Sequence, residues 1–320
     1  MTTNYKGERS HIARPLISDC QKKMKFGIIC DSAADLPEKT AKENQIQIVP
    51  FYVSLDGKEY KKEGTEIAPL QLYQGMADHP DYFPKTSTPT IPDYAEAFYS
   101  VIKQGLPVLC ICLTQKFSSS YQAALSAKEL VQSELPEAKI FVMDSQLATG
   151  LEGVLVTEAA RLRDQDWEIE DAVKHLEELR GTGHIFFTTK DLKYLHNGGR
   201  LSSTAYIAGS MLDIKPLLHC HEGDLTMDGV CRGQKKSLHK IADKFVSYLT
   251  QNHIDLRGYV FGTGVGLGCP EYDDFLETLQ KKMDENDLHP DKWIKIQIGA
   301  TIGVHTGPYP VGLGFVKRAL

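Results

Sequence analysis

The stretch FGIICDSAADLP, residues 26–37, begins with a short apolar run and turns polar at Asp31-Ser32. The apolar run predicts a buried strand over 26–30. Asp35 with Glu38 three residues later is typical of a capping box, which predicts a helix start there. The same order of apolar run and helix recurs at 108–113 with 121–135, and at 140–143 with a helix to about Arg163. This alternation predicts an α/β fold with a parallel sheet.

Polar residues follow each of these predicted strands. The segments are Asp31-Ser32, Ser118-Ser119-Ser120 and Asp144-Ser145. Ligands of open α/β sheets bind at the carboxyl ends of the strands, so we expect these segments to lie at one functional edge. The three aspartates Asp31, Asp35 and Asp144 are also candidates for a cation site, although aspartates after strands more often cap helices.

The second half of the chain has a different pattern. Glu222-Gly223-Asp224 between two apolar runs predicts a hairpin. The other expected elements are helices at 169–179 and 238–249 and strands at 184–189, 259–261, 295–298 and 311–316. We therefore predict two domains after a polar tail: residues 1–23 form the tail, 24–163 an N-terminal Rossmann-like α/β domain with a parallel sheet, and 164–320 a C-terminal α+β domain with a mixed sheet.

Composition narrows the class of protein. The chain has 320 residues, 42% of them hydrophobic, and a net charge of −6. These values exclude a disordered or fibrous chain, and the mild acidity argues against nucleic acid as a principal partner. No apolar run approaches the roughly 20 residues that span a bilayer, so we expect at most transient membrane contact and a cytoplasmic location. Seven cysteines, an odd number, do not indicate a disulfide framework.

Four polar constellations are candidates for ligand binding. Residues 85–90, Lys-Thr-Ser-Thr-Pro-Thr, lie in a loop expected over 79–92 and offer hydroxyls for a carboxylate or phosphate. Residues 118–120 stand at a predicted helix start, which attracts anions. Residues 198–202 place a guanidinium beside two glycines, and His305 lies between glycines 303 and 307. Each constellation also has a structural alternative. Residues 85–90 could be a solvated turn, 118–120 a helix cap, 198–202 a surface turn, and His305 a structural histidine.

Other motifs give no support for a nucleotide or a metal. The glycine-rich residues 262–268 lack the third glycine of G-x-G-x-x-G, so we interpret them as a loop at a strand end. Neither a Walker A sequence nor a G-x-S-x-G elbow is present. His219 and His221 would share one face of a strand, but no second pair has zinc-site spacing, so no metal is expected.

Several motifs, taken in order, resemble those of the DegV family. Residues 31–37, DSAADLP, resemble its D-S-T/A-x-D-L opening, and residues 85–90, KTSTPT, resemble its T-S-Q-P-S loop. Residues 113–124, LTQKFSSSYQAA, resemble its L-S-S-x-L-S-G-T-Y-Q-S-A segment. Three further motifs match: its G-G-R loop at residues 197–202, an I-K-P segment at 214–216 and H-T-G-P at 305–308. The resemblance extends from about residue 24 to the C-terminus.

The resemblance implies a two-domain α/β protein that binds one long-chain fatty acid between its domains. Such a protein is a carrier without a cofactor of its own. It presents the fatty acid to a separate ATP-dependent fatty acid kinase, and the acyl phosphate that results supplies phospholipid synthesis. The physical chemistry is consistent with a carrier, because each buried CH₂ contributes about 0.8 kcal/mol and a long tail alone can bind tightly.

The resemblance also assigns roles to particular residues. The carboxylate-binding positions correspond to Thr86, with Ser87 beside it, and to Ser118 and His305. Ser119 stands where the family has glycine, so a backbone conformation that serine disfavours would alter this head-group site. Arg200 corresponds to the arginine thought to recognise the kinase or the phosphate. The candidates to line the fatty acid tail come from residues 207–214 and are Ile207, Met211, Leu212 and Ile214. The alternative is that these side chains pack in a core helix.

Two other functions remain open at this stage. One is a stand-alone phosphotransferase or hydrolase that uses His305 and a serine. The other is a regulatory lipid sensor that has no kinase partner. Kinase activity by this chain alone would need an ATP cradle, and none of its motifs provides one.

Overall fold

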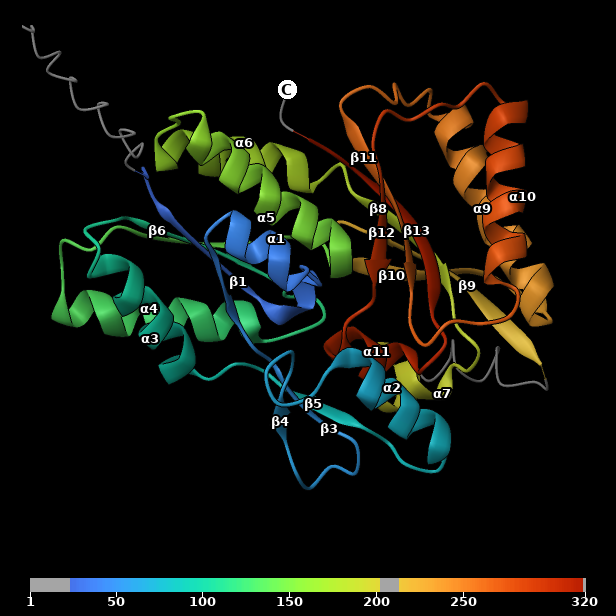
Figure 1. Ribbon diagram of the computed structural model, residues 1–320, viewed down its shortest axis with the longest axis horizontal. Helices are drawn as coiled ribbons and strands as arrows, with labels where there is room; N and C mark the ends of the chain where they lie inside the picture. The colour runs from blue at the N-terminus through green and yellow to red at the C-terminus, as the bar shows by residue number, and fades with distance from the viewer. Residues whose placement is uncertain (1–23, 202–212, 319–320) are drawn as a thin grey trace, which may run out of the picture.

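Two large sheets of different construction form the two sides of the computed structural model, which describes residues 24–201 and 213–318 (Figure 1). The first sheet has the order β2-β1-β6-β7 and comprises Ile46–Val49, Gly27–Asp31, Val108–Cys112 and Ile140–Asp144. All three of its pairings are parallel. The carboxyl ends of its strands therefore lie at one edge, and the predicted parallel α/β sheet is confirmed.

The second sheet is mixed, as predicted. Its order is β10-β9-β8-β13-β11-β12, made of Asp224–Arg232, Ile214–His221, His184–Thr188, Val311–Lys317, Tyr259–Val265 and Trp293–Gln297. Only β11 and β12 pair in parallel. The expected hairpin is β9–β10, and its turn has positive φ at both Glu222 and Gly223, as a type I′ turn requires. Helices α9 (Gln234–Gln251) and α10 (Tyr272–Glu285) pack on one face of this sheet.

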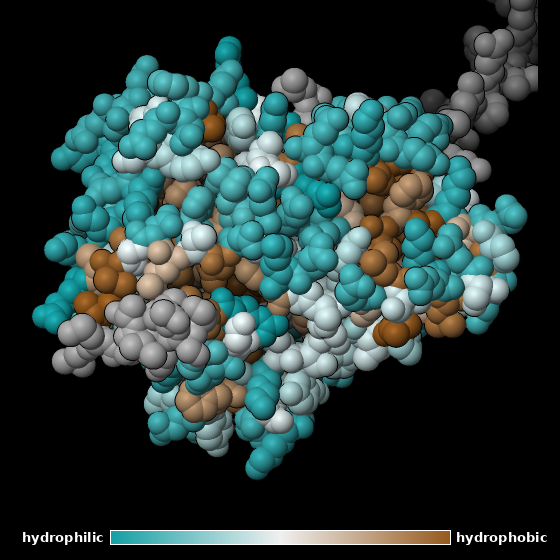
Figure 2. All heavy atoms as spheres, turned by 180° about the vertical axis from the view of Figure 1, so that it is seen from behind, coloured by the Kyte–Doolittle hydropathy of each residue, from teal (hydrophilic) through white to brown (hydrophobic). Residues whose placement is uncertain are grey.

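A third, small sheet lies below the two large sheets in the view of Figure 1. It is antiparallel, with the order β4-β3-β5, and comprises Lys61–Lys62, Tyr52–Ser54 and Lys85–Ser87. Residues 79–92 are therefore not all loop, because β5 pairs with β3 there. Helix α11 (Ala300–Thr306) packs against α2 (Pro69–Asp78) and α7 (Lys193–Asn197) beside this sheet (Figure 1). Seen from behind, hydrophobic side chains surround a hollow near the middle of the molecule (Figure 2).

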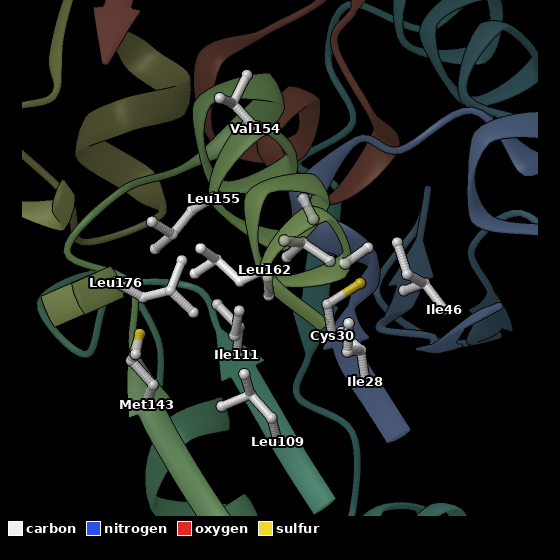
Figure 3. Close-up of a cluster of buried hydrophobic side chains, with 14 of the residues drawn as sticks. Ile28, Cys30, Ile46, Leu109, Ile111, Met143, Val154, Leu155, Leu162 and Leu176 are labelled. Carbon is white, nitrogen blue, oxygen red and sulfur yellow. The ribbon is translucent and has the colours of Figure 1, made fainter. Parts of the chain in front are cut away.

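Alternating side chains of the parallel sheet enter two separate cores. Ile29 and Cys110 pack with α3 (Ile91–Ile102) and α4 (Ser120–Glu134). Ile28 and Ile111 point to the other face, against α5 (Thr149–Asp164) and α6 (Ile169–Arg180). Figure 3 shows this second cluster, in which strand residues lie beneath Val154, Leu155 and Leu162 of α5 and Leu176 of α6. Within residues 24–201 and 213–318, every helix is too short or too polar to cross a bilayer.

The edge where β1 ends contains buried carboxyl groups. Asp31 accepts hydrogen bonds from the backbone N–H groups of Ala33 and Leu113, which ties the end of β1 to the end of β6. Burial raises the pKa of Asp31 to about 6. Glu152 in α5 is fully buried, and neither of its carboxyl oxygens finds a hydrogen-bond donor among the described residues. Burial and the negative charge of Asp31 raise the pKa of Glu152 well above its usual range.

We predict that Glu152→Gln stabilises the protein at alkaline pH and not at acidic pH. A carboxyl whose pKa is raised by folding favours the folded state at low pH, and that contribution is lost as the pH rises through the folded pKa. Gln cannot ionise, so at about pH 8 the variant should exceed the wild type by about 1–3 kcal/mol, since each unit by which folding raises a carboxyl pKa costs about 1.4 kcal/mol above both pKa values. Urea unfolding at a series of pH values measures the difference.

A second variant on the same helix provides the control. Glu158 is also buried, but it pairs with Arg161 at 2.9 Å. Glu158→Gln removes an ion pair and should give no gain at alkaline pH. Parallel stability curves for the wild type and Glu152→Gln would contradict the prediction.

Candidate ligand-binding site

A cavity of about 540 Å³ separates the ends of the parallel strands from the mixed sheet. One wall comes from residues that follow the first sheet, among them Phe51, Leu113 and Leu151. The opposite wall is the face of the mixed sheet that α9 and α10 leave open, with Ile185 and Phe187 of β8. A concave, mainly apolar space with a few polar groups is the usual construction of a small-molecule site.

The polar residues predicted from the sequence gather at this cavity. Thr86, Ser87, Ser118, Ser119, Arg200 and His305 all line it. Thr86 and His305 are in direct contact, because Thr86 Oγ1 lies 2.9 Å from His305 Nε2. Ser87 and Ser119 are exposed, whereas Thr86, Ser118 and His305 are half-buried. Residues far apart in the sequence thus form one polar patch in an otherwise apolar space.

His305 is held as a neutral imidazole. Burial lowers its pKa to about 3, and the positive charge of Arg200 contributes in the same direction. Its Nδ1 atom is buried and has no hydrogen-bond partner among the described residues. Gly198 makes this position of the ring possible, because a Cβ atom there would lie 2.3 Å from Nδ1. The neutral ring can either donate to Thr86 or accept from it, according to its tautomer.

The serine segment combines a structural role with a free hydroxyl. Ser118 Oγ accepts the backbone N–H of Ser120, the first residue of α4, at 3.1 Å. The Ser118 O–H has no acceptor among the described residues, so it remains available as a donor to a ligand. Ser119 has φ −85° and ψ 9°, which any residue adopts. Serine in place of the family's glycine therefore causes no backbone strain here.

Arg200 bridges two loops beside the cavity. Its Nε and Nη2 atoms donate to the carbonyl oxygen of Phe117 at 2.9 and 2.5 Å, and its Nη1 donates to that of Gly198. Phe117 immediately precedes Ser118, and Gly198 lies against His305. Arg200 therefore connects the loops that position both head-group candidates.

Glu63, which the sequence analysis did not single out, fixes the helix that carries His305. Its Oε1 accepts the backbone N–H groups of Ala300 and Thr301, and its Oε2 accepts the hydroxyls of Thr301 and Ser32 at 2.5 and 2.6 Å. These contacts satisfy the free N–H groups at the start of α11. Burial raises the pKa of Glu63. The surrounding residues, KKEGTE, read as a solvated charged turn, so the sequence contains no signal of this role.

The aspartates after the strands have structural roles. Asp31 caps the 3₁₀ helix η1 (Ser32–Ala34), and Asp144 accepts the N–H groups of Gln115 and Gln146. Asp35 is not the predicted N-cap, because α1 (Glu38–Glu43) begins after Pro37. Asp35 instead has a left-handed φ of 49°, and one of its oxygens accepts the hydroxyl of Thr149.

Several other predicted positions lie outside the cavity. Ile207, Met211 and Leu212 lie outside the described residues, and Ile214 lines a separate space of about 450 Å³ beside Lys190 and Tyr194. His219 and His221 share one face and stack with His184. In the described ranges, no group of three or more histidine, cysteine, aspartate or glutamate side chains is arranged to hold a metal ion.

The glycine-rich residues 262–268 correct one prediction. Residues 262–265 belong to strand β11, so they are not a loop at a strand end. Gly262 and Gly264 line the cavity together with Gly312 and Gly314 of β13. The alternation of glycine with a larger residue, Gly-Thr-Gly and Gly-Leu-Gly, has the period of two expected of a strand.

Fold and cavity together define an α/β protein with two large sheets and a mainly apolar cavity that hydroxyls and an imidazole also line. The family described as "Uncharacterised protein, DegV family" matches residues 25–318. A DegV domain-containing protein of Caldanaerobacter subterraneus is 32% identical over 296 residues, which is 92% of this chain and 99% of that protein. The chain belongs to the DegV family.

Two solved structures extend the comparison. A fatty acid (stearic acid)-binding protein from Eubacterium ventriosum is 34% identical with a TM-score of 0.83, and the match covers 92% of this chain and 98% of that one. A DegV family protein from Thermus thermophilus, also described as binding fatty acid, is 26% identical with a TM-score of 0.76 over 92% and 100% of the two chains. The α/β architecture predicted from the sequence is thus that of solved DegV proteins.

We predict that Glu63→Ala destabilises the protein by about 2 kcal/mol or more, because it leaves the N–H groups of Ala300 and Thr301 without acceptors. Glu63→Gln should cost less than half as much, since its oxygen still accepts both N–H groups and its NH₂ can donate to the two hydroxyls. Urea unfolding of the two variants gives the comparison. Equal losses of stability would contradict the role assigned to Glu63.

Proposed function

We propose that this protein binds a long-chain fatty acid in the 540 Å³ cavity, with the carboxylate at Thr86, Ser87, Ser118, Ser119 and His305. In this proposal the ligand lies between an N-terminal domain, residues 24–163, and a C-terminal domain, residues 164–320. The observation that carries the proposal is the form of the cavity, which is apolar along most of its wall and polar where Thr86 meets His305.

The energetics of such a complex divide between tail and head group. Each buried methylene contributes about 0.8 kcal/mol, so the tail supplies most of the affinity. A carboxylate leaving water requires hydrogen bonds, which the hydroxyls of Thr86 and Ser118 would donate. Neutral His305 would supply a directed hydrogen bond, while Arg200 would hold in place the loops of Phe117 and Gly198 beside the head group. The fatty acids bound by the Eubacterium ventriosum and Thermus thermophilus proteins support the same ligand class.

We further propose that the protein is a cytoplasmic carrier that presents its ligand to a separate ATP-dependent fatty acid kinase. In that reaction a carboxylate oxygen attacks the γ-phosphate of ATP on the kinase, and acyl phosphate and ADP form. The acyl phosphate would then supply phospholipid synthesis. Exposed Ser87 and Ser119 support this part of the proposal, because they line the cavity and also reach solvent, where a partner has access.

The rival function, a hydrolase or phosphotransferase with His305 as general base, has weaker support. A base whose pKa lies near 3 removes a proton poorly at neutral pH. The hydroxyl beside His305 Nε2 belongs to Thr86, and buried Nδ1 lacks the orienting partner that a catalytic triad uses among the described residues. These features favour binding over catalysis.

We predict that the purified protein carries a fatty acid and that Thr86→Val with Ser118→Ala weakens its binding about 100-fold or more. Each lost hydrogen bond to a charged group contributes about 1.5–3 kcal/mol, and tail burial remains. Native mass spectrometry tests for the copurified ligand. Titration calorimetry with delipidated protein gives the affinities.

An exposed pair of hydroxyls serves as the matched control. Thr65→Val with Ser133→Ala removes the same two groups from the surface and should leave affinity unchanged. Unchanged affinity in the Thr86 and Ser118 variant would contradict the head-group assignment. Turnover of a nucleotide or ester by the chain alone would favour the rival enzyme.

We predict that Arg200→Ala retains the fatty acid and slows acyl phosphate formation by the partner kinase about tenfold or more, since a guanidinium that recognises phosphate contributes at least ~1.4 kcal/mol. Bound lipid and acyl phosphate are measured separately, by mass spectrometry and by a coupled kinase assay. Arg257→Ala, which removes an exposed arginine paired with Asp255, is the control. Loss of lipid from Arg200→Ala would place the guanidinium in the head-group site instead.

A further inference from the structure

The cavity wall contributed by the mixed sheet contains two facing pairs of glycines. In the antiparallel ladder of β11 and β13, Gly262 pairs with Gly314 and Gly264 pairs with Gly312. Paired residues of antiparallel strands share one face, and residues two apart along a strand share it too. All four glycines therefore point to the cavity, which each of them lines.

Glycine inside a strand costs stability, since it contributes no packing and loses more entropy than other residues. Four of them together on two central strands need a reason. None of the four has a positive φ, so the backbone conformation does not require glycine. The absent side chains let Ile296, Ile298 and Leu151, which line the cavity, lie close against the sheet.

The space before each pair is narrow. A Cβ atom at Gly262 would lie 3.1 Å from Ile294 Cγ1 and from Ile296 Cδ1, and one at Gly264 would lie 3.2 Å from Ile298 Cγ1. A Cβ atom at Gly314 would lie 2.9 Å from Leu151 Cδ1 of α5, on the opposite wall. A methyl group added at Gly262, Gly264 or Gly314 would therefore press on Ile296, Ile298 or Leu151, which line the cavity, and so narrow it.

The two pairs lie at different depths. Helix α11 ends at Thr306 just after His305, and the chain then enters β13 at Val311, so Gly312 comes first and Gly314 second. The Gly264–Gly312 pair is accordingly nearer along the chain to His305, and the Gly262–Gly314 pair lies beside Leu151 of α5. Two residues along a strand separate the pairs by about 7 Å.

We propose that these two glycine pairs set the length of acyl chain that the protein accepts. The pair Gly264–Gly312 forms a passage that every bound chain crosses, and the pair Gly262–Gly314 forms the floor that only the distal methylenes of a long chain reach. This inference rests on the proposed function and adds to it the residues that determine chain-length specificity. The cavity and its polar end are observations independent of the glycines.

The test compares Gly262→Ala with Gly264→Ala. The two variants add the same methyl group to the same face of one strand, and both meet the flexible ends of isoleucine side chains. Delipidated wild type and variants are titrated with a series of saturated fatty acids of increasing length. Each displaced methylene should weaken binding about fourfold.

The expected results differ in their dependence on length. Gly262→Ala should weaken the longest chains about fourfold or more and leave the shortest unchanged, whereas Gly264→Ala should weaken all lengths by a similar factor. Gly262→Val should enlarge the length-dependent loss. Unfolding midpoints of the variants, measured without ligand, separate pocket effects from damage to the sheet.

The inference would be overturned if each alanine variant weakened binding of every chain length by the same factor. It would also be overturned if Gly264→Ala, and not Gly262→Ala, gave the loss that depends on length. Fatty acid binding itself would remain intact in both cases. Failure of the wild type to bind any member of the series would instead overturn the proposed function, and the inference with it.

Discussion

The contact between Thr86 Oγ1 and His305 Nε2, at 2.9 Å, is the interaction on which the polar end of the cavity depends. It joins strand β5 of the small sheet to helix α11, so it exists only when both are held in place. Glu63 anchors the first residues of α11, and Gly198 leaves room for the imidazole. Burial then keeps the ring neutral, so Nε2 either accepts the Thr86 O–H or donates to the Thr86 oxygen, according to the tautomer.

A cavity of this size also requires an exception to close packing. Protein interiors have the density of organic crystals, so side chains normally fill such a space. On the face of the mixed sheet toward α9, Phe245, Phe261 and Phe315 contact one another and form an ordinary dense core. On the opposite face the same strands, β11 and β13, carry paired glycines. The stability lost on the cavity side is offset by the aromatic packing behind it.

Sequence patterns predicted the elements that can be recognised from a short run of neighbouring residues. The strands at the start of the first sheet and the β9–β10 hairpin belong to this group. Thr86, Ser118 and His305, which line one cavity, were assigned to one site by the resemblance to the DegV family and not by periodicity. Patterns did not predict the small sheet, because β4 has two residues and β5 lies among prolines. Glu63 was missed because its partners at the start of α11 lie more than 200 residues away. The glycines of β11 were assigned to a loop because glycine marks turns more often than strands.

The groups around α11 explain why His305 carries no charge at the polar end of the cavity. A helix C-terminus favours a cation by about 0.3–1 kcal/mol, which would help protonate His305. Burial and Arg200 oppose this effect, and they prevail, because the pKa of His305 falls to about 3. At the other end of α11, burial raises the pKa of Glu63, so that its charge is also disfavoured. His305 therefore contributes no charge, and the positive groups that line the cavity near the hydroxyls come from Arg200 and Lys85.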